Sequence, residues 1–336
     1  MKKHLLCLAI AGALVATTFS CGNSSKTAST SDTDSTATAT VSPLHVAGTA
    51  LLNAEGDTVR LTGPSLGWHS NWGRFYNEGT LRALKEKWGA NVTRAAIGAH
   101  ESGDCVRTFD TDSAYAVDCA IAAIDGAIAN DMYIICDWHS HNNTAEDAKK
   151  FFKVITEKYG DSPNIIYEIW NEPLDVEWSG VKEYAADVIP VIREKAPSSV
   201  IIVGTPKWDQ DVDVAAESPI EGKNLMYALH FYAGTHKDWH REKADRAIAA
   251  GLPIFISECG SMDCTGDGPI DYESWNAWID WANKNNISVV MWDIADKNET
   301  CSMILPTASD NGMEWKDEEM KEWAKLAKST ISERNN

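Results

Sequence analysis

The sequence is short of basic residues. Its 336 residues include 30 Lys and Arg against 49 Asp and Glu, which gives a formal net charge of −19. A surface that binds nucleic acid or an anionic membrane needs clustered Lys and Arg, so this charge balance argues against both partners. The sequence also has no apolar run of about 20 residues, the length that a membrane-spanning helix requires.

Tryptophan, in contrast, is abundant, with 14 Trp against 7 Phe in a chain that is only 9% aromatic. Large flat rings beyond the needs of a core favour stacking on a ligand with apolar faces. Some tryptophans follow a helical spacing and are expected to pack inside the protein instead: Trp88, Trp275, Trp278 and Trp281.

The N-terminal segment has the pattern of an export signal. Lys2 and Lys3 precede an apolar stretch over residues 5–15, and Ser20-Cys21 resembles the cleavage site of a bacterial lipoprotein. We therefore expect residues 1–20 to be removed and Cys21 to carry a lipid, which would hold the exported protein at the cell envelope. Simple secretion is the alternative. Residues 21–45, mostly Ser, Thr, Ala and Asp, are expected to form a linker.

The cysteines beyond Cys21 fall into two groups. An exported protein meets an oxidising compartment, so disulfides between Cys105 and Cys119 and between Cys264 and Cys301 are expected. The other two cysteines, Cys136 and Cys259, lie within or at the end of strand-like runs. They are expected to be buried thiols.

From residue 46 onward, β-branched or aromatic runs alternate with helix-like stretches. Eight strand-like runs occupy residues 59–63, 91–96, 132–138, 164–170, 200–204, 225–231, 253–258 and 287–292. This count and spacing predict an α/β fold, a (β/α)8 TIM barrel over residues 46–330, with a short N-terminal hairpin at 46–58 that turns at 55–57. A doubly wound open sheet is the alternative, but the glycine-rich phosphate turn after its first strand is missing.

Two predicted strands end in a glutamate. The fourth run leads into Asn171-Glu172-Pro173, and the seventh ends in Glu258-Cys259-Gly260. Active sites of TIM barrels lie at the C-terminal ends of the strands. Glycoside hydrolysis needs two carboxyl groups there, one to protonate the leaving oxygen and one to attack the sugar or activate water. Two solvated loop glutamates are the alternative interpretation.

A metal-dependent hydrolase is another reading of the same strand ends. The His139-x-His141 pair lies beside Asp137, and further candidate ligands are His69, His230, His236 and Asp293. Barrel amidohydrolases, however, carry their His-x-His at the first strand, and here it follows the third. We therefore expect neither a metal nor an organic cofactor.

Several motifs occur together in an order that resembles glycoside hydrolase family 5, most closely its secreted bacterial endo-β-1,4-glucanases. The resemblance covers about residues 46–316 and rests on segments 92–96, 137–139, 169–173, 230–236 and 257–258 and on Trp292. It implies a retaining mechanism in which Glu172 is the general acid/base and Glu258 the nucleophile. Carboxylates about 5 to 5.5 Å apart would fit retention, and about 6.5 to 9.5 Å would fit inversion.

The resemblance also implies roles around the two glutamates. Arg94 and Tyr232 match donors to the nucleophile, and Asn171 matches a residue that holds the sugar 2-hydroxyl. The remaining matches are His139 and His230 in the same subsite, Trp292 under the sugar where cleavage occurs, Trp208 on the leaving-group side, and Lys297 and Glu299 on the other side. On physical grounds we expect the acid to be held protonated by low polarity and a nearby negative charge.

The sequence departs from the family pattern in two places. The family usually has a His and a Trp after the first strand, where Gly67 and Asn71 stand, so nearby His69 and Trp72 are expected to substitute as sugar contacts. Cys259 stands where Trp is common. Neither departure removes a carboxylate.

The expected function is therefore cleavage of internal β-1,4 bonds in β-glucan by a monomeric enzyme. A mannanase, xylanase or mixed-linkage glucanase of the same fold is an alternative, because a few loop residues set which polymer is accepted. A lipoprotein that binds glycans without cutting them is a further alternative, although both glutamates are present.

Overall fold

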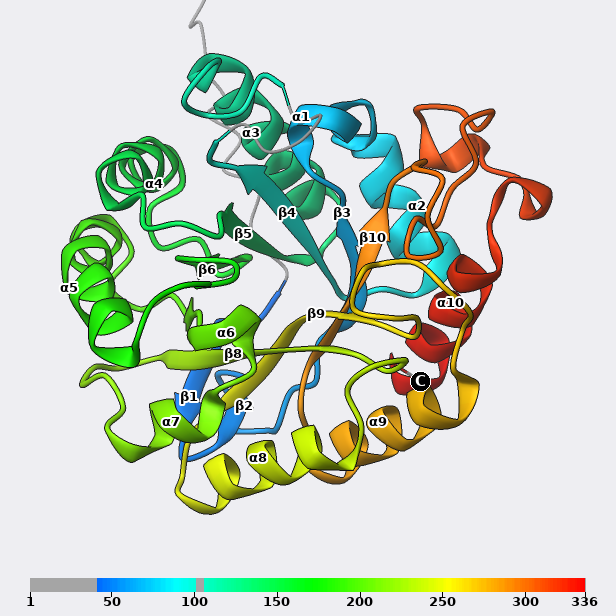
Figure 1. Cartoon of the computed structure of the whole chain (residues 1–336). Coiled ribbons are helices and arrows are strands. Elements are labelled where there is room, and N and C mark those ends of the chain that lie inside the picture. Colours follow the sequence, from blue (N-terminus) through cyan, green and yellow to red (C-terminus); the bar gives the residue numbers. More distant parts are fainter. Residues whose placement is uncertain (1–40, 101–105, 336) are drawn as a thin grey trace, which may run out of the picture. The chain divides into compact units, whose positions relative to one another are not determined.

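The computed structural model describes residues 41–100 and 106–335. The predicted signal segment and Cys21 lie outside these residues. The centre of the fold is a closed barrel of parallel strands in the order β10-β3-β4-β5-β6-β7-β8-β9 (Figure 1). Its strands are β3 (Thr62–Leu66), β4 (Val92–Gly98), β5 (Tyr133–His139), β6 (Ile165–Glu168), β7 (Ile201–Val203), β8 (Leu225–Tyr232), β9 (Ile254–Gly260) and β10 (Val289–Ile294). The predicted TIM barrel is confirmed.

Helices surround the barrel (Figure 1). They are α1 (His69–Trp72), α2 (Glu78–Trp88), α3 (Ser113–Ala129), α4 (Ala145–Tyr159), α5 (Trp178–Lys195), α6 (Pro206–Asp209), α7 (Val212–Glu217), α8 (Asp238–Ala249), α9 (Tyr272–Lys284) and α10 (Glu322–Asn335), with short 3-10 turns at Gly73–Phe75, Gly312–Glu314 and Asp317–Glu319. The tryptophans predicted to pack, Trp88, Trp275, Trp278 and Trp281, are all buried. Amphipathic helices thus bury their apolar faces against the strands.

The N-terminal half of the barrel interior is apolar. Alternate strand residues, such as Val92, Ile166 and Ala228, form one buried cluster with Leu44 and Leu51. Leu51 belongs to the hairpin of β1 (His45–Ala47) and β2 (Ala50–Leu52). The hairpin therefore exists as predicted and packs against the barrel interior.

The turn of this hairpin differs from the prediction. The strands pair Ala47 with Ala50, so the chain reverses at Gly48, whose φ is 59°. Glycine tolerates such a backbone without steric cost. Residues 55–57 belong to a second turn that joins Leu52 to Thr58 by an antiparallel bridge.

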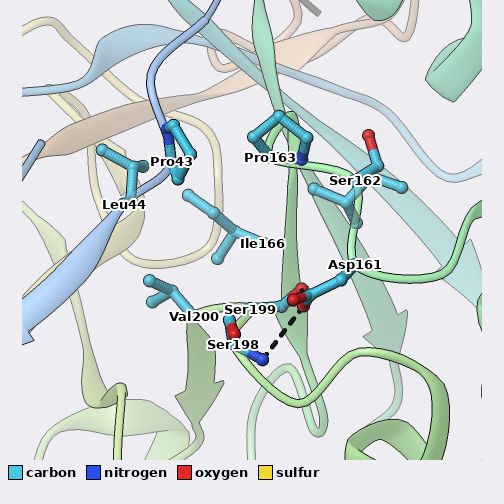
Figure 2. Close-up of a pocket in the computed structure, with 10 residues that line it drawn as sticks. Pro43, Leu44, Asp161, Ser162, Pro163, Ile166, Ser198, Ser199 and Val200 are labelled. Atoms are coloured by element: carbon cyan, nitrogen blue, oxygen red, sulfur yellow. Dashed lines mark hydrogen bonds between the residues drawn. The ribbon is translucent and has the colours of Figure 1, made fainter. Parts of the chain in front are cut away.

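A small pocket lies beside the segment that leads into the hairpin. In Figure 2, Pro43 and Leu44 lie near Ile166, which belongs to β6, and near Val200, which immediately precedes β7. The backbone N–H of Ser198 donates to Asp161 Oδ1 at 3.0 Å at the edge of this pocket. Residues 43–44 thus pack against two strands that lie far away in the sequence.

The C-terminal half of the barrel interior is polar. Because strand side chains alternate between faces, Arg94 lies one layer above Val92, Glu168 above Ile166 and His230 above Ala228. These polar side chains are all buried. The barrel thus presents an apolar floor and a charged upper layer, on which the candidate site is built.

Neither predicted disulfide is present among the described residues. Cys264 and Cys301 are both free thiols. Cys264 is exposed and contacts Asp263, whereas Cys301 is buried and contacts Glu299. Cys119 is also free, and Cys105 lies outside the described residues. Cys136 and Cys259 are buried thiols, as predicted. No helix within residues 41–100 or 106–335 is long and apolar enough to cross a membrane.

Candidate active site

Two carboxylates face each other at the C-terminal end of the barrel. Glu172 follows β6, Glu258 lies in β9, and an oxygen of each lies within 4.8 Å of the other. Both line a cleft of about 370 Å³, together with His141, Trp208, Gln210, His230, Tyr232, His236 and Cys264. Oxygens this close fit the carboxyl separation of about 5 to 5.5 Å in retaining glycosidases better than the about 6.5 to 9.5 Å of inverting ones.

Glu258 is held by one donor on each of its oxygens. Arg94 Nη1 donates to Oε2 at 3.0 Å, and the Tyr232 hydroxyl donates to Oε1 at 2.7 Å. Charge-assisted bonds of this kind are among the stronger hydrogen bonds in proteins, so they fix the orientation of the carboxylate. The sequence-based pairing of Arg94 and Tyr232 with Glu258 matches this geometry.

Arg94 is fully buried and is shared among several acidic groups. Its Nε donates to Glu168 Oε2 at 2.6 Å, and its Nη2 lies 3.0 Å from Asp137 Oδ2. Burial raises the pKa of Glu168 but is outweighed by Arg94 and His230, which together lower it to about 2. The guanidinium therefore faces an ionised carboxylate inside the barrel as well as Glu258.

Asn171 is oriented by the same guanidinium. Arg94 Nη2 donates to Asn171 Oδ1 at 2.5 Å. The other end of the amide, Nδ2, is buried and has no hydrogen-bond partner among the described residues. A buried donor without a partner is costly, so this group is suited to a ligand oxygen.

Glu172 is bound by two histidines. His141 Nε2 donates to Oε2 at 3.1 Å, and His230 Nδ1 donates to Oε1 at 2.9 Å. Burial raises the pKa of Glu172, but these bonds outweigh burial and lower it below its usual value, while the pKa of His141 is raised by the same contact. In the unliganded protein these contacts favour the ionised form of Glu172, whereas the acid was expected to be held protonated.

Behind His230 stands a buried aspartate. Asp209 Oδ2 lies 3.2 Å from His230 Nε2, and Ser257 Oγ lies 3.0 Å from the same nitrogen. Burial alone would lower the pKa of His230, but the neighbouring carboxylates, with Asp209 first among them, raise it well above its usual value. His230 therefore bonds Glu172 through Nδ1 and Ser257 through Nε2, and Asp209 acts on it as a nearby buried carboxylate whose Oδ2 has no hydrogen-bond partner among the described residues.

The α6 segment is a left-handed turn that places Asp209 and Trp208 on opposite sides. Lys207, Trp208 and Asp209 have φ of 58°, 57° and 56°, a conformation that is unfavourable for residues other than glycine. The backbone N–H of Trp208 donates to the carbonyl oxygen of Pro173 at 3.2 Å, and the backbone N–H of Thr205 donates to Asp209 Oδ1. The turn directs Trp208 into the cleft and Asp209 into the barrel.

A second group of aromatic rings, Trp292, His139 and Trp68, lies near Arg94 and His141 but does not line the cleft. Trp292 stacks on His139 with centroids 5.2 Å apart and planes within 8°, and Trp68 meets His139 edge-on at 4.5 Å. His139 Nδ1 contacts Asp137 Oδ2 at 2.7 Å. Burial, reinforced by Arg94, lowers the pKa of His139. His139 is thus uncharged, and its ring packs face to face against the Trp292 ring.

Of the residues predicted after the first strand, His69 does not reach the cleft. It is fully buried, its Nδ1 accepts from Gly98 N at 3.0 Å, and its Nε2 donates to Arg107 O at 3.2 Å. Burial lowers the pKa of His69 to about 4. The prediction of a sugar contact is therefore wrong for His69, because backbone groups occupy both ring nitrogens.

The other outlying predictions lie at the rim. Trp72 is half-buried and its Nε1 donates to Asp296 Oδ1 at 2.7 Å. Lys297 and Glu299 follow β10 and form an ion pair with each other at 2.6 Å. None of the three lines the cleft that holds the two glutamates.

The histidine-rich metal cluster considered from the sequence does not assemble in the described part of the chain. His139 is bound to Asp137 and His141 to Glu172. Three metal-competent side chains, of which only His230 was among those candidates, do have ligand atoms within 4.8 Å of one another: Glu172, His230 and Glu258. This group contains both glutamates, and each of its members is engaged in the hydrogen bonds described above.

Sequence reasoning missed His141 and Asp209 as partners of the glutamate pair, and Glu168 as a partner of Arg94. His141 lies two residues beyond His139 at the end of β5, and that spacing was a usable indication. Glu168 occupies an inward position of β6, two residues after Ile166. Asp209 gave no such indication, because a left-handed turn without glycine is not readable from its residues.

Comparisons with known proteins agree with this geometry. The family described as cellulase (glycosyl hydrolase family 5) matches residues 52–298. Endoglucanase Z of Dickeya dadantii is 42% identical over 282 residues, which cover 82% of this chain. A solved structure from Cytophaga hutchinsonii has a TM-score of 0.84 at 37% identity and covers 87% of this chain and 95% of its own.

A third similar structure is the catalytic domain of a Thermobifida fusca endoglucanase, with a TM-score of 0.81 at 30% identity over 86% of this chain and 97% of that one. A variant of that domain has been solved in complex with cellotetraose. The curated relatives are longer than the matched region: the chain spans 65% of the length of the Dickeya protein and 53% of an endoglucanase A from Evansella cellulosilytica.

Proposed function

Because the chain belongs to the cellulase family of glycosyl hydrolases, family 5, we propose that it is a retaining endo-β-1,4-glucanase. The observation that carries the proposal is the Glu172–Glu258 pair, whose oxygens lie within 4.8 Å in a cleft lined by Trp208 and Tyr232. Relatives named endoglucanase support the choice of polymer.

In the first step, Glu258 attacks the anomeric carbon and the bond to the leaving oxygen breaks. Glu172 donates its proton to that oxygen, so the departing chain leaves as an alcohol and a glycosyl ester remains on Glu258. Arg94 and Tyr232 hold the two oxygens of Glu258. One oxygen has to leave its donor as the ester forms.

The proton that Glu172 needs is supplied by its histidine partners. In the open cleft the proton rests on the histidine side of the pair, because the ionised carboxylate accepts bonds from His141 and His230. A bound sugar expels water, and a low-polarity environment favours a neutral pair over an ion pair. Substrate binding therefore moves the proton towards Glu172, where the leaving oxygen takes it up.

In the second step, Glu172 acts as a base. It removes a proton from a water whose oxygen attacks the anomeric carbon, and the ester bond to Glu258 breaks. Glu258 regains its negative charge, and the product keeps the configuration of the substrate because two inversions have occurred. The same pair of residues thus serves both steps.

Sugar contacts follow from the groups around the pair. Asn171 Nδ2, which has no partner among the described residues, is directed to the 2-hydroxyl of the sugar that is attacked. Trp292 supports the face of that sugar, and Trp208 stacks on the leaving-group side. The family resemblance assigns Lys297 and Glu299 to the opposite side, and Trp72 belongs to the same rim.

The proposal is tested by reducing-end release from soluble β-glucan, carboxymethylcellulose, mannan and xylan, using residues 22–336. We expect activity on the glucans that E258Q abolishes. Cleavage of mannan or xylan instead would keep the mechanism and replace the polymer. Binding of glucan without cleavage of any polymer would overturn the hydrolase proposal in favour of a glycan-binding lipoprotein.

We further propose that the mature protein begins at a lipidated Cys21 and that a linker joins this anchor to a monomeric catalytic domain at the cell envelope. The support is the sequence alone: Lys2 and Lys3, the apolar residues 5–15 and the Ser20-Cys21 junction. Incorporation of a labelled fatty acid in cells that express the full chain, and its loss in C21S, tests the anchor. An unlabelled protein in the medium would indicate simple secretion.

A further inference from the structure

Two tryptophans expose their rings at the catalytic end of the barrel. Among the described residues, Trp208 and Trp239 are the tryptophans that remain exposed, each by 45%. Trp208 follows β7, and Trp239 is the second residue of α8, after β8. Strands β7 and β8 are paired neighbours, so both tryptophans lie at the same end of adjacent strands.

The orientation of Trp239 follows from its place in the helix. Helical side chains tilt towards the N-terminus of their helix, and the N-terminus of α8 faces the catalytic end. Its ring packs on His236 and His240, with centroids 5.7 Å and 4.9 Å away, but is not covered by them. A large apolar ring therefore stays in contact with solvent beside the active site.

The buried carboxylate of Asp211 forms ion pairs with a lysine from each of the two segments that carry these tryptophans. Asp211 Oδ2 pairs with Lys207 Nζ at 2.8 Å, and Asp211 Oδ1 accepts a bond from Lys243 Nζ. Lys207 precedes Trp208, and Lys243 lies one turn after Trp239 with its Nζ 6.0 Å from that ring. An ion-pair network therefore links the segment that carries Trp208 to the helix that carries Trp239.

His236 connects Trp239 to the cleft. It lines the cleft with Glu172 and Trp208, and its Nδ1 accepts from the Tyr232 N–H at 2.8 Å. Burial lowers the pKa of His236 to about 4, so it is uncharged near neutral pH. The surface between the cleft and Trp239 is therefore aromatic and uncharged at this point, which suits a neutral sugar chain.

We propose that Trp239 is a further sugar-stacking platform, which extends the leaving-group side of the cleft beyond Trp208 and binds a distal unit of a β-linked glucan. The inference rests on the proposed function for the direction of the chain, since the leaving chain departs past Glu172. Stacking on one ring contributes roughly a two- to ten-fold gain in affinity for chains long enough to reach it.

The experiment compares W239A, the conservative W239F and the matched control V214A, whose side chain is exposed on neighbouring α7 and does not line the cleft. For W239A we expect kcat/KM on cellohexaose to fall roughly two- to ten-fold, and the loss to shrink as the substrate is shortened to cellotriose. W239F should recover part of the loss, and V214A should match the parent protein on every substrate.

A binding assay separates this inference from the proposed function. Cellohexaose is titrated into E258Q and into E258Q/W239A, and the second protein is expected to bind it roughly two- to ten-fold more weakly. Weaker binding supports the platform whether or not the parent protein cleaves the chain. Equal binding by both proteins, or a W239A loss that is the same for short and long substrates, would overturn it.

Discussion

Replacement of Glu172 by Gln separates acid catalysis from binding. The amide has nearly the shape of the carboxylate but has no proton to donate. General acid catalysis contributes about 10² to 10⁴ in rate, so E172Q should lose roughly that factor in kcat/KM on cellulosic substrates. A dinitrophenyl cellobioside has a leaving group that departs without a proton, and its first-step rate should fall only a few-fold.

The structure adds a second expectation for E172Q. His141 and His230 each donate to one oxygen of Glu172, and Gln retains a single oxygen, so one charge-assisted bond is lost. That loss is about 1.5 to 3 kcal/mol in unfolding free energy. Exposed Glu177, changed to Gln, is the matched control and should alter neither rate nor stability. Equal losses of E172Q on both substrates, measured by stopped-flow release of dinitrophenol, would refute the acid role.

Three further perturbations test the surroundings of the pair. R94M leaves Glu168 and Glu258 without their buried cation, so denaturant unfolding should show a loss of about 3 to 5 kcal/mol, and a change under 1 kcal/mol would contradict the buried network. D209N should lower the pKa of His230, because it removes a negative charge 3.2 Å from Nε2, and should move the basic limb of kcat/KM to lower pH; an unchanged imidazole titration by NMR would argue against this interaction. Burial lowers the pKa of His240 to about 3 in the folded protein. The unfolded chain therefore binds a proton at higher pH than the folded protein, and the unfolding free energy should fall by on the order of 4 kcal/mol between pH 6.5 and pH 3. H240Q should flatten this dependence of unfolding free energy on pH.

Much of the fold was readable from hydrophobic runs because eight buried parallel strands need eight such runs. The first strand was predicted over residues 59–63 and lies at Thr62–Leu66, since Pro64 and Ser65 in that strand weaken the local β pattern. The predicted disulfide between Cys264 and Cys301 failed because nothing in the spacing says that one side chain is exposed and the other buried.

The site was predictable to the extent that its residues stand at strand ends. Glu172 and Glu258 were predicted in this way, whereas Arg94, the third residue of β4, was assigned from the family resemblance. Asp209 and the exposure of Trp208 depend on a left-handed turn that tertiary contacts impose. The protonation of Glu172 depends on distances to two histidines from other strands, which no local pattern encodes.

The most direct test of the account is covalent labelling of the nucleophile. A 2-deoxy-2-fluoro cellobioside with a good leaving group slows the second step, so the glycosyl ester accumulates and can be located by peptide mass mapping. The account predicts one label, on the peptide that contains Glu258, in the parent protein and none in E258Q. A label on another residue, or sustained glucan cleavage with no label at all, would contradict the assigned mechanism.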